Sequence, residues 1–179
     1  NRDIRTLSES EEQENKMWQQ QRLIEYLNEM PVIQLMLEAV EADDIISYVV
    51  QDSNYKGWQK IIVSSDKDFF QLCDEETVIY RPIQKKFVNR NNILEEYKIH
   101  PTNFALARAM VGDRSDNLEG VRGVGLASVA KRFEFLVEDK SFLVDDIMKR
   151  CEEVESKLKI YNNIAENRSL IEDNYRLMQ

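Results

Sequence analysis

Three short clusters of carboxylates are the residues of this chain whose types and spacing could do chemistry. The clusters lie in the segments VEADD, SSDKD and GDRSDN, and together they contain seven acids: Glu41, Asp43, Asp44, Asp66, Asp68, Asp113 and Asp116. Carboxylates that gather in a fold repel one another unless a cation lies among them, and hard divalent cations such as Mg²⁺ prefer oxygen ligands. If the fold brings the three clusters together, we expect one divalent-metal site.

Each cluster also has a purely structural interpretation. Acids in the first turn of a helix are stabilised by the helix dipole, which explains one or two of the acids between Glu41 and Asp44. Aspartates are common in turns and at N-caps, and for Asp66 and Asp68 taken alone this interpretation is favoured. Asp116 could likewise be a capping residue. The prediction of a metal site therefore depends on the clusters converging.

The third cluster runs directly into a glycine-rich turn. Of the five glycines in the chain, four lie between Gly112 and Gly125. Glycines so close together indicate a backbone that approaches another group closely or adopts positive φ more than once. Backbone N–H groups and a helix N-terminus at such a turn suit contacts to phosphates, although a corner between two helices needs no ligand. Basic residues flank the turn: Arg114, Arg122, Lys131 and Arg132.

Composition limits the class of protein. The 179 residues are 42% hydrophobic and 32% charged, which favours a packed core over disorder. The net charge of −9 argues against indiscriminate binding of nucleic acid, but residues 101–133 carry five basic and three acidic side chains, a local charge of +2. One histidine and two separated cysteines exclude a zinc cluster and favour a reduced, cytoplasmic protein. No signal peptide or membrane-spanning apolar stretch is visible.

Hydrophobic spacing and turn residues predict the elements that position the acids. Strands are expected at 32–37, 60–64 and 77–81, and helices at 13–28, 41–51 and 68–73. This alternation predicts right-handed βαβ units and a parallel sheet flanked by helices. Functional groups collect beyond the carboxyl ends of such strands, so we expect the first two acidic clusters at one edge of the sheet. From residue 93 onward the pattern is helical, with helices at 101–111, 124–133, 143–158, 160–169 and 170–178.

These elements predict an α/β fold in three parts. Residues 1–30 form a helical lead-in, whose first 15 residues are polar and expected to fray. Residues 31–99 form the α/β core that holds the metal, and residues 100–179 form a helical region. The acids of the third cluster thus reach the core from the helical region.

In their order, the three acidic motifs resemble those of the structure-specific 5′ nucleases. VEADD, SDKD and GDRSDNLEGVRGVG are similar to motifs of a family that includes the 5′-nuclease domain of bacterial DNA polymerase I, flap endonucleases, phage 5′ exonucleases and the T-even phage ribonuclease H. The resemblance runs from Val32 to Phe133. It implies a PIN-like 5′-nuclease core followed by a helix-three-turn-helix at 101–133 that holds duplex DNA by its backbone. The DNA-binding residues implied in this way are Arg114, Gly120, Arg122, Gly123, Gly125, Lys131 and Arg132.

The resemblance also implies an activity that depends on all seven acids as metal ligands, with the six aspartates catalytic. The expected assignment is Glu41, Asp43 and Asp44 at a first metal position, Asp113 and Asp116 at a second, and Asp66 and Asp68 between them. Two Mg²⁺ or Mn²⁺ ions would support a 5′→3′ exonuclease or flap endonuclease that cuts phosphodiesters of DNA or RNA–DNA duplexes carrying a 5′ end or flap. K⁺ would bind main-chain carbonyls of the Gly120–Gly125 turn. The implied role is primer removal during replication, by a cytoplasmic monomer that meets replication proteins, in the host cytoplasm if a phage encodes it.

One part of the family pattern is not visible in the chain. The family begins with a strand that ends in an essential aspartate and continues into a basic helical arch, whereas residues 1–28 resemble the stretch that follows the arch. The expected core thus lacks its first strand, and a duplex-binding module or fragment that no longer cuts is an alternative. A Mg²⁺-dependent phosphatase on an α/β fold is a second alternative. It is disfavoured because a small substrate needs no duplex-sized helical platform.

Overall fold

The computed structural model describes residues 8–154 and 158–179. The chain divides into two compact units, Asn1–Ala42 and Asp43–Gln179. The first unit contains α1 (Glu9–Asn28), which begins with a capping box. Ser8 Oγ accepts a hydrogen bond from the Glu11 N–H at 3.3 Å, and the Glu11 carboxylate accepts one from the Ser8 N–H at 2.9 Å. The helix predicted at 13–28 is confirmed and starts earlier than expected, because this box satisfies its first N–H groups.

The apolar run at 32–37 does not form the strand that its composition predicts. The segment has no strand conformation, and Ile33 and Met36 are 86% and 94% exposed. A strand needs a hydrogen-bonded partner, and among the described residues β-sheet pairing is confined to three strands further along the chain. The prediction of a buried strand is wrong. A short apolar run has the composition of a strand, but it does not show whether a second segment forms hydrogen bonds with it.

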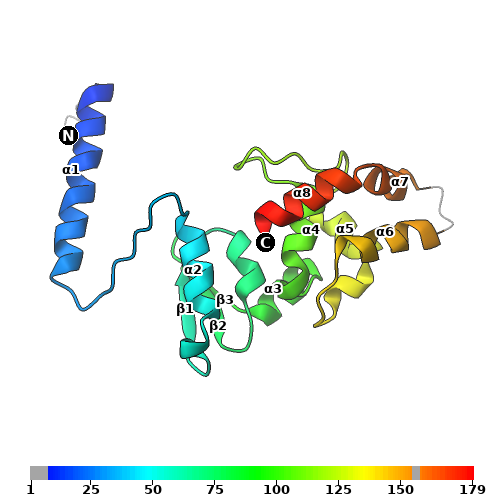
Figure 1. The fold of residues 1–179 in the computed structure, drawn as a ribbon, viewed down its shortest axis with the longest axis horizontal. Coiled ribbons are helices and arrows are strands. Elements are labelled where there is room, and N and C mark those ends of the chain that lie inside the picture. Colours follow the sequence, from blue (N-terminus) through cyan, green and yellow to red (C-terminus); the bar gives the residue numbers. More distant parts are fainter. Residues whose placement is uncertain (1–7, 155–157) are drawn as a thin grey trace, which may run out of the picture. The chain divides into compact units, whose positions relative to one another are not determined.

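The second unit contains a three-stranded sheet in the order β1-β2-β3 (Figure 1). β1 (Lys60–Val63) runs parallel to β2 (Thr77–Arg81), as the sequence predicts. β3 (Lys86–Val88) is antiparallel to β2 and was not expected. The connection between β2 and β3 is too short for a parallel crossover, which needs about a dozen residues. The sheet is therefore mixed, which corrects the expectation of a purely parallel sheet.

Helices and short turns flank the sheet and extend from it (Figure 1). Around the sheet lie α2 (Ala42–Gln51), η1 (Ser53–Tyr55), η2 (Asp68–Leu72) and α3 (Arg90–Tyr97). The helical region contains η3 (Pro101–Asn103), α4 (Phe104–Val111), α5 (Leu126–Arg132), η4 (Glu134–Val137), α6 (Val144–Glu153), α7 (Lys159–Glu166) and α8 (Arg168–Met178). The helices expected in this region are confirmed with shifted ends. α6 ends at Glu153, before the predicted end at 158, and residues 155–157 lie outside the described residues.

Buried aromatic side chains fix η2 against α4. The rings of Phe70 and Phe104 lie 5.3 Å apart, and Tyr97 of α3 packs on both, with ring centroids at 5.9 and 5.3 Å. Phe70 and Phe104 are each only 1% exposed. Aromatic pairs at these distances contribute beyond their buried area. Because η2 follows β1, this packing brings the carboxyl end of β1 close to α4.

The last helix joins these elements to the glycine-rich turn. α8 lies alongside α4 (Figure 1). The buried side chain of Asn174 donates to the carbonyl of Ala109 at 3.0 Å and to the carbonyl of Glu119 at 2.8 Å. Gln71 of η2 donates to the carbonyl of Met178 at 2.7 Å. Through these bonds α8 holds η2, α4 and the loop after α4 in fixed positions. Among the described residues, no helix combines the length and apolarity that crossing a membrane requires.

Candidate metal centre

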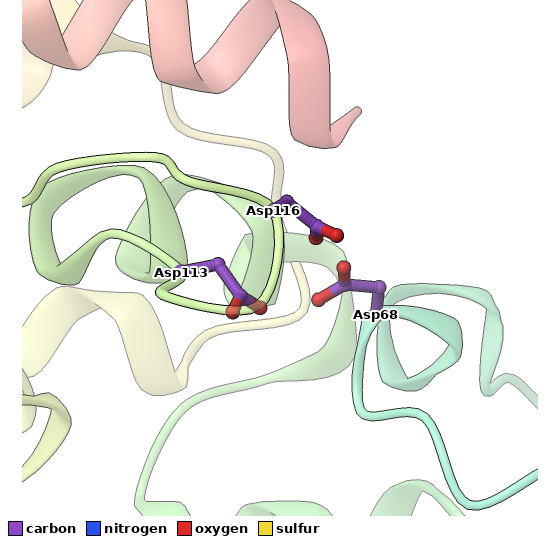
Figure 2. Close-up of side chains that lie close together, drawn as sticks. All are labelled: Asp68, Asp113 and Asp116. Carbon is purple, nitrogen blue, oxygen red and sulfur yellow. The ribbon is translucent and has the colours of Figure 1, made fainter. Parts of the chain in front are cut away.

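Three aspartates from two distant segments meet beyond the carboxyl end of β1. Asp68 is the first residue of η2, and Asp113 and Asp116 lie in the loop that follows α4. One carboxylate oxygen from each lies within 4.8 Å of the others, and Figure 2 shows the three side chains gathered at one point. Within the described part of the chain, this is the group of acids whose spacing could hold a metal ion. A set of oxygen donors at this spacing suits a hard divalent cation such as Mg²⁺ or Mn²⁺.

The loop after α4 is shaped to present its two acids. Asp113 and Leu118 exchange backbone hydrogen bonds of 2.8 and 2.7 Å, which closes a tight turn around Asp116. Asn117 takes the left-handed conformation with φ of 56°, which asparagine tolerates better than most residues. Ser115 donates from its N–H and its hydroxyl to the Asp113 carboxylate. The turn therefore fixes the direction of Asp113 and leaves Asp116 exposed at its tip.

Asp66 supports Asp68 from the same turn. Its carboxylate accepts a hydrogen bond from the Asp68 N–H at 2.9 Å, and its own N–H donates to Ser64 Oγ at 3.0 Å. Asp66 thus acts in this structure as the turn residue that its sequence position allows, and it is not a member of the group of three. Its role as a metal ligand remains a prediction.

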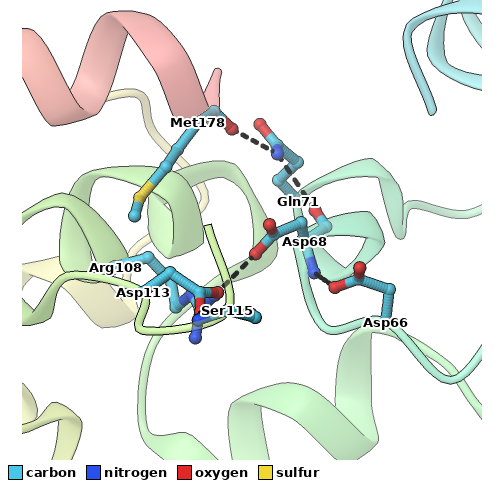
Figure 3. A network of polar contacts seen from close by, with 7 residues as sticks. All are labelled: Asp66, Asp68, Gln71, Arg108, Asp113, Ser115 and Met178. Atoms are coloured by element: carbon cyan, nitrogen blue, oxygen red, sulfur yellow. Dashed lines mark hydrogen bonds and ion pairs between the residues drawn. The ribbon is translucent and has the colours of Figure 1, made fainter. Parts of the chain in front are cut away.

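Arg108 of α4 is the basic residue inside the site. Its guanidinium donates to Asp68 Oδ1 at 3.0 Å and to the Asp113 carboxylate, so that it bridges the two acids (Figure 3). The Arg108 side chain is only 14% exposed. In the sequence, Arg108 is one of the five basic residues in 101–133. Its position five residues before Asp113, on the helix that leads into the third cluster, is the signal that could have indicated its role.

The surroundings of Asp68 and Asp113 shift the pKa values of these two acids in opposite directions. Burial raises the pKa of Asp68, and the nearby charges of Asp66, Asp113 and Asp116 act in the same direction against the opposing effect of Arg108. Burial would also raise the pKa of Asp113, but hydrogen bonds from Ser115 and the charge of Arg108 outweigh it, so that this pKa is lowered. The two carboxylates therefore differ in opposite directions from an ordinary aspartate, although they share the same arginine.

The acids of the first cluster lie elsewhere in the chain. Asp43 and Asp44 are exposed in the first turn of α2, where the Asp43 carboxylate accepts a hydrogen bond from the Asp44 N–H at 3.1 Å. They are not in the group of three. Glu41 belongs to the first unit. The structure thus brings together three of the seven predicted ligands, and convergence of the other four remains a prediction.

The four glycines of the third motif lie in different surroundings. A Cβ at Gly120 would lie 1.8 Å from the Val111 carbonyl oxygen, and one at Gly112 would lie 2.3 Å from Gly120 N, so these two glycines permit a close crossing of the backbone. Gly123 has φ of 78° and open space around it. Gly125 has an extended backbone, and no atom lies within 4 Å of the place that a Cβ would occupy there. Neither internal packing nor backbone conformation therefore explains Gly125.

Two arginines line an open groove at this turn. The groove, of about 870 Å³, is lined by residues between Val111 and Val124, among them Arg114 and Arg122. These two arginines and Lys131 are exposed, and Arg132 is half-buried. In the segments 8–154 and 158–179, none of the four side chains makes an ion pair. Their charges are therefore available to an anionic partner.

Comparison with known proteins identifies the family. The sequence profile of the 5′-3′ exonuclease N-terminal resolvase-like domain matches residues 8–98, which is half of the chain. The chain belongs to this family. A 5′-3′ exonuclease of Buchnera aphidicola is 32% identical over 157 residues, which cover 87% of this chain and 48% of the relative. DNA polymerase I of Streptococcus pneumoniae is 38% identical over 107 residues, which cover 56% of this chain and 12% of the polymerase. The chain spans less than half the length of these relatives.

Solved structures of the bacteriophage T5 enzyme share the fold. The T5 5′-exonuclease with bound zinc ions superposes with a TM-score of 0.76 at 20% identity, covering 97% of this chain and 62% of that one. The T5 flap endonuclease in a pseudo-enzyme-product complex with DNA and metal ions gives a TM-score of 0.75 at 19% identity over the same shares. At this identity the likeness shows the fold of the 5′-3′ exonuclease family, which is the α/β arrangement with a small mixed sheet described above.

Proposed function

We propose that the protein is a metal-dependent 5′→3′ exonuclease or flap endonuclease that hydrolyses phosphodiesters of DNA or RNA–DNA duplexes with a 5′ end or flap. The observation that carries the proposal is the meeting of Asp68, Asp113 and Asp116 next to a cation-rich glycine turn in a chain of the 5′-3′ exonuclease family. Relatives named as 5′-3′ exonucleases and as DNA polymerase I support a role in primer removal during replication. The cytoplasm, a monomeric state and contacts with replication proteins are parts of the same proposal.

The acids have distinct tasks in this proposal. Asp113 and Asp116 hold one Mg²⁺ or Mn²⁺ ion, Glu41, Asp43 and Asp44 hold a second, and Asp66 and Asp68 lie between the two ions. When bound, such ions activate water and stabilise the leaving oxygen, so that no nucleophilic side chain is required. Asp66 also fixes the backbone of Asp68, and Ser115 fixes the carboxylate of Asp113. These residues therefore act by orienting the ligands.

The segment from η3 to α5 acts as the duplex platform, in the manner of a helix-three-turn-helix at 101–133. The open surroundings of Gly123 and Gly125 allow a phosphate backbone to approach the main chain closely. Arg114, Arg122, Lys131 and Arg132 supply charges for the phosphates, and carbonyls of the Gly120–Gly125 turn supply ligands for K⁺. Such contacts hold the duplex without reading its sequence.

The direct test is cleavage of a 5′-flap duplex by the full-length gene product. We expect cleavage that requires MgCl₂, stops when a chelator is added, and leaves a 5′-phosphate on the released product. A duplex of the same sequence with blunt, blocked 5′ ends serves as the control substrate. Binding of the flap without cleavage at saturating MgCl₂ would contradict the proposal, as would hydrolysis of small phosphate esters in place of DNA.

Charge reversal at Lys131 or Arg132 should weaken duplex binding and flatten its dependence on salt. Each lost phosphate contact is expected to reduce the slope of log K against log salt by about 0.9. The measurement is fluorescence anisotropy of a labelled duplex between 50 and 200 mM salt, the range over which about 10³-fold changes occur for proteins with several phosphate contacts. The matched control is Lys149→Glu on α6, whose side chain is 74% exposed. Unchanged slopes for both Lys131→Glu and Arg132→Glu would exclude α5 from the DNA interface.

A further inference from the structure

The position of Arg108 has a consequence for metal binding. One terminal nitrogen of its guanidinium contacts both Asp68 and Asp113, which are two of the three acids that could hold the ion. All three side chains are largely shielded from water: Arg108 is 14%, Asp113 13% and Asp68 26% exposed. Two carboxylates so close and so shielded repel each other strongly unless a positive charge lies between them. In the metal-free protein, Arg108 supplies that positive charge.

The same contact places Arg108 in competition with a metal ion. A divalent cation held by this group would draw on the same two carboxylates that the guanidinium contacts, and both cations satisfy the same excess of negative charge. The guanidinium is also incompletely bonded, since its buried Nε has no hydrogen-bond partner among the described residues. An arginine held by one nitrogen is easier to release than one held by both arms of its fork. The geometry therefore favours replacement of the Arg108 guanidinium by a metal ion over a permanent contact of Arg108 with Asp68 and Asp113.

We propose that Arg108 is a built-in counter-cation that bridges Asp68 and Asp113 in the metal-free protein and is released from at least one of them when a divalent ion binds. The inference rests on the proposed function, because it requires the acids to take up a metal. Arg108 is then a positioning residue: it keeps the site assembled before the ion arrives, and its release offsets part of the binding free energy. Metal affinity is consequently set below what the carboxylates alone would give.

The competing interpretation is that Arg108 forms a permanent structural salt bridge. The two interpretations predict opposite changes in metal affinity when Arg108 is removed. If Arg108 only held the two carboxylates in place, its loss would disorganise the ligands and weaken metal binding. If Arg108 competes with the ion, its loss tightens metal binding while the metal-free protein becomes less stable. Metal affinity and metal-free stability then change in opposite directions, which a purely structural role would not produce.

The first experiment uses the unaltered protein. Side-chain NMR of ¹⁵N-labelled arginine reports whether rotation of the Arg108 guanidinium is hindered. We expect hindered rotation without metal and faster rotation after saturation with MgCl₂, with Arg168 of the Asp145–Arg168–Glu172 contact as an internal control that should not change. Rotation that stays hindered at saturating MgCl₂ would overturn the release of Arg108 and leave the metal site intact. Absence of any MgCl₂ binding would overturn the proposed metal site and this inference with it.

The second experiment measures MnCl₂ affinity by calorimetry and metal-free thermal stability in a set of variants. Arg108→Met should bind MnCl₂ about tenfold more tightly, within the usual range of coupling between two ligands. Its metal-free Tm should fall by about 10 °C, because two shielded carboxylates lose their partner. Arg108→Lys keeps the charge and should restore most of the metal-free Tm. Lys149→Met removes one exposed charge and should change neither quantity. Weaker MnCl₂ binding by a folded Arg108→Met would overturn the proposal, and if this variant fails to fold, the NMR measurement decides.

Discussion

Changing Asp68 or Asp116 to asparagine is expected to lower flap cleavage on the order of 10³-fold or more while duplex binding stays within a few-fold of the unaltered protein. Each substitution removes one carboxylate from the group of three that could hold a metal ion. A bound divalent ion contributes several kcal/mol to stabilising charge in the transition state, and about 4 kcal/mol corresponds to a 10³-fold change in rate. In the proposed function, duplex binding depends on the basic residues at the glycine turn, and removing a negative charge nearby does not weaken contacts to phosphates.

Single-turnover cleavage in MgCl₂ and anisotropy in the presence of a chelator measure the two effects separately. Asp173→Asn is the matched control, since it makes the same chemical change at a residue that is 64% exposed on α8 and only weakly paired with Arg176. It should leave cleavage and binding unchanged. Equal loss of cleavage and binding in Asp68→Asn and Asp116→Asn would show that these acids support the fold or the duplex contact and not the chemistry.

Local signals in the sequence were sufficient for several elements that position the site. Lys60–Val63 and Thr77–Arg81 are short runs of apolar and β-branched residues bounded by polar turns, and both form the strands expected. The helix before Gly112 was predictable from an early proline and a terminal glycine. The run at 32–37 shows the limit of the same signals. Its composition is that of a strand, yet pairing is a property of two segments, and one apolar run cannot reveal it.

Contacts between residues far apart in the chain could not be predicted from such local signals. Arg108 and Asp68 are 40 residues apart, and neither residue carries a local feature that names the other as its partner. Asn174 reaches two carbonyls 65 and 55 residues away. The sequence shows only an asparagine within an amphipathic helix, which does not predict these two hydrogen bonds. The glycines show an intermediate case: their density predicted a close backbone approach, but only the structure identifies Val111 as the group that Gly120 approaches.

The second large effect is expected on stability, at the point where the backbone of Gly120 crosses that of Val111. Gly120→Ala should lower the free energy of unfolding by about 3 kcal/mol or more, the upper part of the range for overpacked sites, and lower Tm by about 10 °C. The added Cβ would lie 1.8 Å from the Val111 carbonyl oxygen and 2.7 Å from Gly112 N. These contacts are all with backbone, which cannot move aside as a flexible side chain could. The crossing is also held by a hydrogen bond of 2.9 Å from the Val121 N–H to the Met110 carbonyl. Thermal and urea unfolding measure the change.

Gly125 provides the matched control and separates stability from duplex binding. Gly125 is the N-cap of α5, with φ of −132° and open space around it. Serine is a better N-cap than glycine, so Gly125→Ser should leave Tm unchanged or raise it slightly. If a duplex backbone approaches the main chain here, the same substitution should weaken binding of a 5′-overhang duplex, because the new side chain occupies the space of the approaching phosphate. Full duplex affinity in a stable Gly125→Ser would exclude close approach at this residue. A Gly120→Ala variant as stable as the unaltered protein would exclude the backbone crossing as the reason for that glycine.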